Sequence, residues 1–158
     1  MNIRPLEPRD QPAASALIES GLRERFQPYI AAYNPDLERL AEAHLVFLVG
    51  ELEGRVVSTG GLIAEDAQTV RVRRMSVAAD LRGRGLGARM LEALLQAARE
   101  CGFRRAVLLT GTDWHSAIRL YERAGFKRAG TMTDASSGFV GASFALDLEP
   151  RELQPFEQ

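Results

Sequence analysis

The hydrophobic pattern changes its period along the middle of the chain. Positions 69–77 alternate apolar and polar side chains, and the apolar positions slip by one residue at Arg74-Met75. Alternation with a period of two predicts a half-buried strand, and a slip of one residue predicts a β-bulge within it. Over positions 86–98 the apolar residues recur at helical spacing instead, which predicts an amphipathic helix that ends near Gly102.

The first half of the chain predicts two helices and a hairpin. A weak apolar stripe begins at Pro12 and ends at Gly21, and Asn34 followed by a proline is typical of the N-cap of a second helix. The apolar runs 45–49 and 55–63 are joined by a glycine-containing turn, which predicts a β-hairpin.

The second half predicts a short strand, a helix and a closing pair of strands. We expect a buried strand over 106–109, a helix over 115–124 that Gly125 ends, and strands over 126–133 and 143–148. A stretch of small residues, 134–141, joins the last two strands. The order of elements is that of an α/β protein with antiparallel pairs. We expect one domain over residues 1–150 and a frayed tail over 151–158.

Composition agrees with a single globular domain. The chain has 158 residues, of which 46% are hydrophobic and 26% charged. No window approaches the roughly 18–20 apolar residues of a membrane span, and the first ten residues lack the apolar core of a secretory signal. The single cysteine, Cys101, cannot form an internal disulfide, which favours a cytoplasmic protein. We expect Cys101 to be a small core residue.

The charge is balanced overall but not along the chain. Nine arginines and three acidic residues between Arg71 and Arg105 give this segment +6, within a chain of net charge −1, so the remainder carries −7. A local basic segment indicates either a site for an anionic ligand or a solvated arginine-rich surface. The glycine-rich loop 81–88 is the candidate location of such an anion site.

Residues 81–88, Leu-Arg-Gly-Arg-Gly-Leu-Gly-Ala, lie between the bulged strand and the amphipathic helix. Glycines let main-chain N–H groups approach an anion, and the helix N-terminus adds unpaired N–H groups and partial positive charge. The alternative is a flexible turn without a ligand. A dinucleotide fingerprint is disfavoured because five residues separate Val77 from Gly83, and no P-loop motif is present. These residues therefore indicate a phosphate site without naming its ligand.

Two motifs resemble those of the GNAT superfamily of N-acetyltransferases. Met75-Ser76-Val77 followed by Arg82-x-x-Gly85-x-Gly87 is similar to the acyl-CoA loop of that family, Q/R-x-x-G-x-G/A. About 30 residues later, 117–126 (Ala-Ile-Arg-Leu-Tyr-Glu-Arg-Ala-Gly-Phe) is similar to the family's A-x-x-L-Y-x-x-x-G-F stretch. The resemblance implies a mixed, mostly antiparallel twisted sheet, splayed at a central bulged strand and flanked by helices.

The resemblance also implies acetyl-CoA as cosubstrate. We expect its pyrophosphate to lie on the glycine loop and its pantetheine arm to lie beside the bulged strand. The amides of the arm would pair with exposed main-chain groups of this strand, and a main-chain N–H group of the same segment would polarise the thioester carbonyl. The residues expected to contact acetyl-CoA are Met75, Ser76, Val77, Arg82, Gly83, Arg84, Gly85, Leu86, Gly87, Ala88 and Trp114. Trp114 replaces an asparagine that is frequent in the family, and it could instead form a wall of the acceptor pocket or simply be a half-buried aromatic residue.

Tyr121 is the candidate general acid. Its free pKa is about 10, so it holds a proton at neutral pH and can give it to the departing thiolate; the alternative is a core tyrosine. The general base is open, because Arg71 occupies the position where many relatives have glutamate. Glu65, Asp66, Glu42 or a chain of water molecules could take its place.

The resemblance places the amine acceptor between the N-terminal helices and the last loop. The segment 21–33, with Phe26, Tyr29 and Tyr33, and the loop 134–141 are the expected contacts, although these aromatics could equally form a helix core face. The negative charge outside the basic segment favours a cationic acceptor. Neither histidine has a partner at metal-ligand spacing, so we expect no metal.

The leading hypothesis is an N-acetyltransferase that moves the acetyl group from acetyl-CoA directly to a primary amine of a small molecule or peptide. We expect a cytoplasmic enzyme that binds neither nucleic acid nor a membrane, and a homodimer is one possible assembly. A non-catalytic acyl-CoA-binding module or sensor is the alternative, motivated by Arg71. A third hypothesis is a nucleic-acid binder that uses the 71–105 segment, with strongly salt-dependent affinity.

Overall fold

The computed structural model describes residues 1–149 and forms one seven-stranded sheet with the strand order β1-β2-β3-β4-β5-β7-β6. The strands are β1 (Asn2–Pro5), β2 (Val46–Leu52), β3 (Arg55–Ala64), β4 (Thr69–Val77), β5 (Arg105–Gly111), β6 (Lys127–Thr133) and β7 (Val140–Asp147). The helices are α1 (Gln11–Arg25), α2 (Leu40–Ala43), α3 (Leu86–Glu100) and α4 (His115–Arg123). Short 3₁₀ turns lie at Pro8–Asp10, Ala31–Tyr33, Pro35–Glu38 and Ala79–Leu81.

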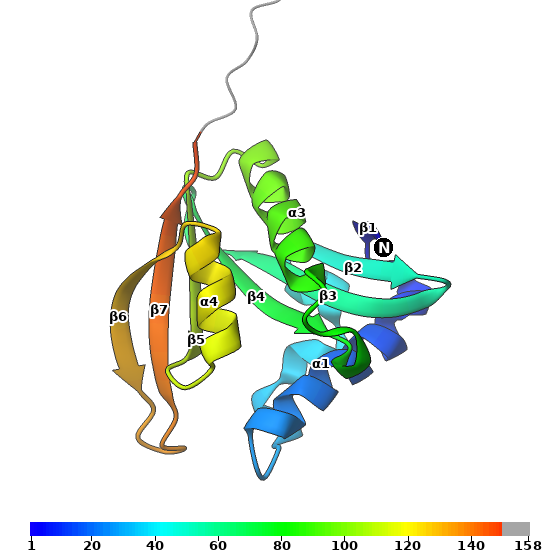
Figure 1. Ribbon diagram of the computed structural model, residues 1–158, viewed down its shortest axis with the longest axis horizontal. Helices are drawn as coiled ribbons and strands as arrows, with labels where there is room; N and C mark the ends of the chain where they lie inside the picture. The colour runs from blue at the N-terminus through cyan, green and yellow to red at the C-terminus, as the bar shows by residue number, and fades with distance from the viewer. Residues whose placement is uncertain (150–158) are drawn as a thin grey trace, which may run out of the picture.

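Helices cover both faces of the sheet. Helices α3 and α4 lie in front of the strands in Figure 1, and the apolar stripe of α3 packs on one face of β2, β3 and β4 through residues such as Leu48, Leu62 and Val72. Helix α1 packs on the other face, against Phe47 and Val49 of β2. Successive β2 side chains therefore enter different cores, as the period of two in a strand requires.

Strands β4 and β5 are paired along only part of their length. They are the parallel pair of the sheet, and their register covers Thr69–Arg71 against Arg105–Val107. Beyond these residues the two strands diverge, toward the lower part of Figure 1. The second half of β4 therefore has a sheet partner, β3, on one side only. The mixed, mostly antiparallel sheet splayed at a central strand is confirmed.

The predicted bulge lies where β4 leaves β5. In the β3–β4 register Thr59 faces Ser76 and Gly61 faces Arg73, so two residues of β4 lie opposite the single residue Gly60. Arg74 adopts φ +57°, a left-handed conformation that is uncommon for a non-glycine residue. The bulge ends the regular pairing and turns the next three residues toward the splayed side.

Three expectations from the sequence were wrong. The first helix continues through Gly21 to Arg25, because Gly21 lies against Ser76 of β4 and tertiary packing outweighs the weak helix propensity of glycine. The second helix is reduced to the 3₁₀ turn Pro35–Glu38 and the single turn α2, since the Asn34 side chain donates to the Ile30 carbonyl instead of capping a helix. Cys101 is exposed, because it follows the last residue of α3.

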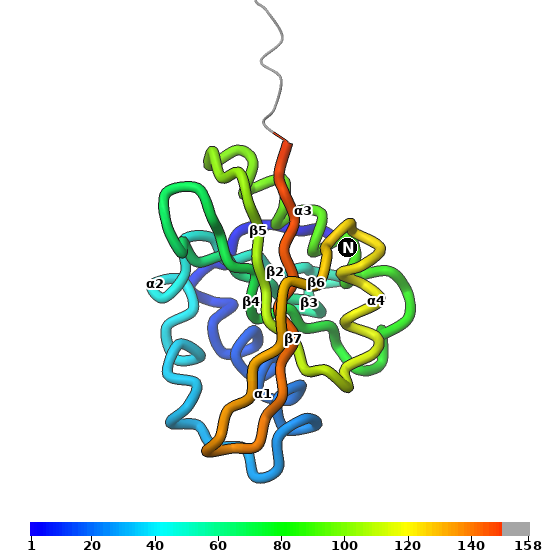
Figure 2. The backbone as a smooth tube through the Cα atoms, turned by 90° about the vertical axis from the view of Figure 1, so that its left-hand side faces the viewer, coloured from blue at the N-terminus to red at the C-terminus, as the bar shows by residue number. Residues whose placement is uncertain are grey.

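The β6–β7 hairpin reaches the end of α1 (Figure 2). β7 begins at Val140, three residues before the predicted start, and the joining loop is closed by the Asp134 carboxylate, which accepts from Ser136 and Ser137. The proposed tail, 151–158, lies outside the described residues. Among the helices of residues 1–149, none combines the length and apolar character needed to cross a membrane.

Candidate active site

A cavity of about 540 Å³ fills the space between the splayed strands. Its walls come from the end of α1, the second half of β4, the end of β5 and the first two turns of α4. Six of the predicted site residues line it, namely Met75, Ser76, Val77, Arg82, Trp114 and Tyr121. The structure therefore brings the end of the bulged strand, Arg82 and the candidate acid to one cavity. The other predicted residues, Gly83, Arg84, Gly85, Leu86, Gly87 and Ala88, do not line it.

The glycine loop adjoins this cavity with its N–H groups free. Gly83 and Gly85 adopt φ +77° and +80°, and a Cβ built on either would meet no atom within 4 Å. Gly85 is the N-cap residue of α3. Within residues 1–149, no main-chain or side-chain acceptor takes a hydrogen bond from the N–H groups of residues 83–88. An open row of unpaired N–H groups at the start of a fifteen-residue helix is a suitable cradle for a diphosphate.

Arg82 and Arg84 flank this cradle with different partners. Arg82 makes a two-pronged ion pair with Glu24 at the end of α1, with distances of 2.8 and 3.1 Å. The hydrogen bond from Arg82 holds the pKa of Glu24 below its ordinary value. Arg84 is exposed on the loop. The loop is thus tied to α1 by one arginine while the other remains accessible to a phosphate.

Tyr121 lies on the cavity wall opposite the bulge. It is 9% exposed, and its ring packs edge-on against Phe126. Burial raises the pKa of its phenol to about 12. Within residues 1–149 the hydroxyl takes part in no hydrogen bond, so its proton is available to a group in the cavity. A protonated phenol at neutral pH is the state a general acid requires.

The cavity also exposes main-chain groups of β4. Residues 72–77 have no β5 partner, and the Arg74 carbonyl is held on the other side by the Thr59 hydroxyl at 2.8 Å. An extended amide-containing arm can pair with such a free strand edge. The free edge and the adjoining N–H cradle are the features that an extended amide-containing arm with a diphosphate, such as that of acetyl-CoA, requires.

Trp114 forms a wall with two other aromatic rings. Its ring lies 5.8 Å from that of Phe26 at the end of α1 and 5.7 Å from that of Phe139 in the β6–β7 loop. The guanidinium of Arg25 lies over the Trp114 ring, 4.1 Å from its centroid. A side chain at Gly111 would collide with the indole, since a Cβ there would come within 2.5 Å of it. These contacts hold Trp114 in place as a wall of the cavity, and the Arg25 guanidinium on its ring carries a positive charge.

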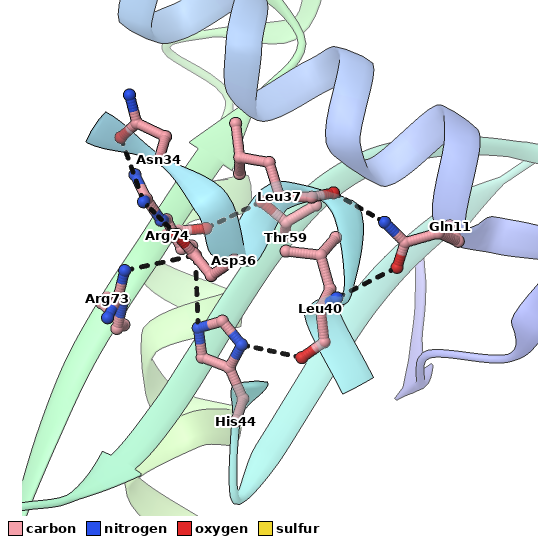
Figure 3. A network of polar contacts seen from close by, with 9 residues as sticks. All are labelled: Gln11, Asn34, Asp36, Leu37, Leu40, His44, Thr59, Arg73 and Arg74. Carbon is pink, nitrogen blue, oxygen red and sulfur yellow. Dashed lines mark hydrogen bonds and ion pairs between the residues drawn. The ribbon is translucent and has the colours of Figure 1, made fainter. Parts of the chain in front are cut away.

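A second group of charges lies beneath the bulge, around Asp36 (Figure 3). Asp36 accepts two hydrogen bonds from Arg74, at 2.6 and 2.8 Å, and lies 3.2 Å from Arg73. Burial opposes ionisation of Asp36, but the hydrogen bond from Arg74 and the charges of both arginines outweigh it, so its pKa lies below the ordinary value. The carboxylate thereby holds the bulge residue against the 35–38 turn.

His44 lies next to Asp36 and belongs to the same group of polar side chains. Its Nδ1 lies 2.7 Å from the Leu40 carbonyl, which can only accept, so Nδ1 carries the proton. Its Nε2 is buried without a hydrogen-bond partner among the described residues and lies 3.9 Å from Asp36. Burial lowers the pKa of His44.

None of the candidate bases lines the cavity among the described residues. Glu65 is paired with Arg71, Asp66 accepts from the N–H groups of Gln68 and Thr69, and Glu42 is exposed on α2. Residues 1–149 contain no cluster of three or more His, Cys, Asp or Glu side chains that could hold a metal ion.

The acceptor side differs from the expectation as well. Phe26 lines the cavity, whereas Tyr29 packs with the α1 core and Tyr33 is 73% exposed. Sequence reasoning missed the arginines of the cavity wall as a group: Arg25, Arg71, Arg73, Arg74 and Arg82. The excess of arginine was visible, but the convergence of α1 with β4 was not.

Comparisons with known proteins agree with this geometry. Residues 12–126 match the model of the acetyltransferase (GNAT) family. The chain is 31% identical over 164 residues to the uncharacterized N-acetyltransferase YjgM of Escherichia coli, covering 96% of this chain and 93% of that protein. It is 36% identical over 96 residues to human N-acetyltransferase 8B, of which it spans only 42%.

The fold is shared with yncA of Salmonella typhimurium, solved with its cofactor acetyl-CoA. The TM-score is 0.77, at 20% identity over 94% of each chain. The matched region of the family model contains the glycine loop, the bulged strand and Tyr121, which are the parts that build the cavity. The chain belongs to the GNAT family of acetyltransferases.

Proposed function

We propose that the protein transfers an acetyl group from acetyl-CoA directly to a primary amine, with Tyr121 as the general acid. The observation that carries this proposal is the position of a protonated, buried phenol on a cavity that is also lined by Arg82, the residue directly before the row of free main-chain N–H groups at 83–88. Acetyl-CoA supplies the acetyl group as an activated thioester.

Each part of the site has a separate task. The N–H groups of residues 83–88, with Arg84, bind the diphosphate, and the free edge of residues 75–77 orients the arm. An N–H group of this edge donates to the thioester carbonyl and stabilises the negative charge that develops there. Met75 and Trp114 keep the reacting atoms away from bulk water.

The proton balance assigns Tyr121 its role. The neutral amine forms the new C–N bond while the C–S bond breaks, and Tyr121 gives its proton to the departing sulfur. The phenolate then recovers a proton from the newly formed, positively charged amide nitrogen. The net products are the amide and the free thiol, and no side chain changes its protonation state over the cycle.

The test is thiol release from acetyl-CoA across a panel of small amines and short peptides. We expect turnover for at least one acceptor and a fall in kcat of about 100-fold or more in Tyr121→Phe, the range typical of a lost general acid. Calorimetry on the same variant should show acetyl-CoA binding unchanged. A kcat in Tyr121→Phe equal to that of the parent would contradict the assignment of Tyr121.

A second candidate function is a non-catalytic acyl-CoA-binding module. It is favoured by Arg71, which stands where the family's glutamate is frequent and is neutralised by Glu65. Acetyl-CoA binding without thiol release for any acceptor would support it.

Nucleic-acid binding receives less support, because four of the nine arginines of the 71–105 segment are engaged in ion pairs with Asp36, Glu65 or Glu24. A cytoplasmic location and a homodimer stay predictions.

A further inference from the structure

The cavity wall is strongly positive. Five arginines line it, and among the described residues no acidic side chain does. Three of these arginines are paired with a carboxylate: Arg82 with Glu24, Arg71 with Glu65 and Arg74 with Asp36. Two guanidiniums, those of Arg25 and Arg73, therefore remain without a carboxylate of their own.

Arg25 and Arg73 differ from the other three arginines of the cavity in their charged neighbours. Arg73 shares Asp36 with Arg74, which binds it through two shorter contacts. Arg25 contacts the Trp114 ring and, within residues 1–149, no carboxylate at ion-pair distance. Burial lowers the pKa of both guanidiniums, and their acidic neighbours, Asp36 for Arg73 and Glu24 with Asp113 for Arg25, offset this only in part. An additional anion in the cavity would compensate this excess positive charge.

The diphosphate already has its own partners at the other end of the site. The N–H groups of residues 83–88 have no acceptor among the described residues and Arg84 is exposed, whereas Arg73 lies on β4 before the bulge, beside Asp36. A small anion next to Arg73 therefore belongs to the second substrate. Guanidinium groups bind carboxylates in a planar, two-pronged arrangement, and both partners are charged.

We propose that the acceptor is an amine that also carries a carboxylate, a free amino acid or a close analogue, and that Arg73 with Arg25 binds this carboxylate. This inference rests on the proposed function and narrows it, because it excludes diamines, polyamines and internal lysines as preferred acceptors. It also replaces the expectation of a cationic acceptor, which was drawn from the charge of the whole chain and not from the cavity. The apolar rings of Phe26 and Trp114 on the same wall favour an apolar side chain.

The test compares matched acceptors. For phenylalanine, leucine and alanine, thiol release is measured with the free amino acid, its amide and its decarboxylated amine, and rates are expressed per concentration of neutral amine. We expect the free acid to have the highest kcat/KM, by about 10-fold or more, as for the loss of a charge-assisted hydrogen bond. Equal or faster acetylation of the amides or amines would overturn the inference while leaving the proposed acetyl transfer intact. No thiol release with any member of this panel, but turnover of another amine in the wider panel, would also overturn the inference. No release in either panel would contradict both proposals.

Variants assign the carboxylate site to its residues. In Arg73→Gln we expect the KM of the amino acid to rise about 10-fold or more, with the KM of acetyl-CoA and of the decarboxylated amine unchanged, and in Arg73→Lys a smaller rise. Arg25→Gln should behave in the same way, and Arg128→Gln, an exposed arginine on β6, is the control. A parallel loss for the amino acid and the amine would show a merely structural role and contradict the assignment. A rise confined to the KM of acetyl-CoA would place that arginine in the cosubstrate site and likewise contradict it.

Discussion

The Thr59 hydroxyl donates a 2.8 Å hydrogen bond to the main-chain carbonyl of Arg74, the residue that the bulge holds at φ +57°. Thr59 is fully buried on β3. This bond satisfies a carbonyl that the bulge removes from the β3–β4 ladder, and it holds β4 in the shape that leaves its other edge free.

Thr59→Val should therefore destabilise the protein. The substitution keeps the shape of the side chain but leaves a buried carbonyl without a donor, which costs about 1–3 kcal/mol. Thr59→Ser keeps the hydroxyl and serves as the matched control. Denaturant unfolding measures the difference, and the KM for acetyl-CoA should rise only in the valine variant. Equal stability of the two variants would show that the bond does not hold the bulge.

The positive φ angles of the glycine loop predict a selective loss of acetyl-CoA binding. Gly83→Ala and Gly85→Ala should each raise the KM for acetyl-CoA, because alanine disfavours the left-handed conformation by roughly 1–2 kcal/mol and turns the N–H groups away. Gly54 in the β2–β3 turn has φ +78° and is equally open, so Gly54→Ala is the matched control. Similar stability losses in all three variants, with a KM change in the first two alone, are expected from steady-state kinetics and thermal unfolding.

The absence of a carboxylate from the described cavity lining predicts an unusual pH dependence. Tyr121, with its pKa of about 12, stays protonated over the accessible range. The fraction of neutral amine then limits the rate at low pH, so kcat/KM should rise about tenfold per pH unit up to the pKa of the acceptor itself. Two acceptors of different pKa distinguish the outcomes. A shared break between pH 5 and 7 would reveal a base supplied by the enzyme.

His44 predicts a dependence of stability on pH. Its pKa is lowered in the folded state, so the unfolded chain binds a proton first as the pH falls, and the free energy of unfolding should decrease below about pH 6.5. Asp36, Arg73 and Arg74 are the charged groups that face it. His44→Asn keeps a donor for the Leu40 carbonyl without titrating, and should flatten the curve between pH 7.5 and 5.5. If the free energy of unfolding depends on pH in this variant as it does in the parent, another group causes the dependence.

The parts of the site that lie close together in the chain could be predicted from the sequence. The period change at 74–75, the glycines of 83–87 and the stripe of α3 are local patterns, and each corresponds to a local structure. The burial of Tyr121 follows from the spacing in α4, whereas its role as general acid was predicted from its ordinary pKa and the resemblance to the GNAT family and stays a prediction.

The parts of the site that depend on contacts between distant segments could not be predicted from the sequence. Arg25 and Arg73 are 48 positions apart, and only the packing of α1 against β4 brings them to one cavity. The expectation of a helix after Asn34 failed for a similar reason, since Asp36 is held by Arg74 of β4 and the local caps do not determine the backbone there. Overall charge was likewise a poor guide, because it counts surface carboxylates that lie outside the cavity.

The central claim is that the N–H groups of residues 83–88 bind the diphosphate of CoA. A titration followed by ¹⁵N–¹H NMR, with CoA in one series and pantetheine in the other, tests it directly. We expect the amide signals of Gly83, Gly85 and Gly87 to shift with CoA and to stay in place with pantetheine, which lacks the diphosphate. Saturable CoA binding that leaves these three signals unmoved would contradict it.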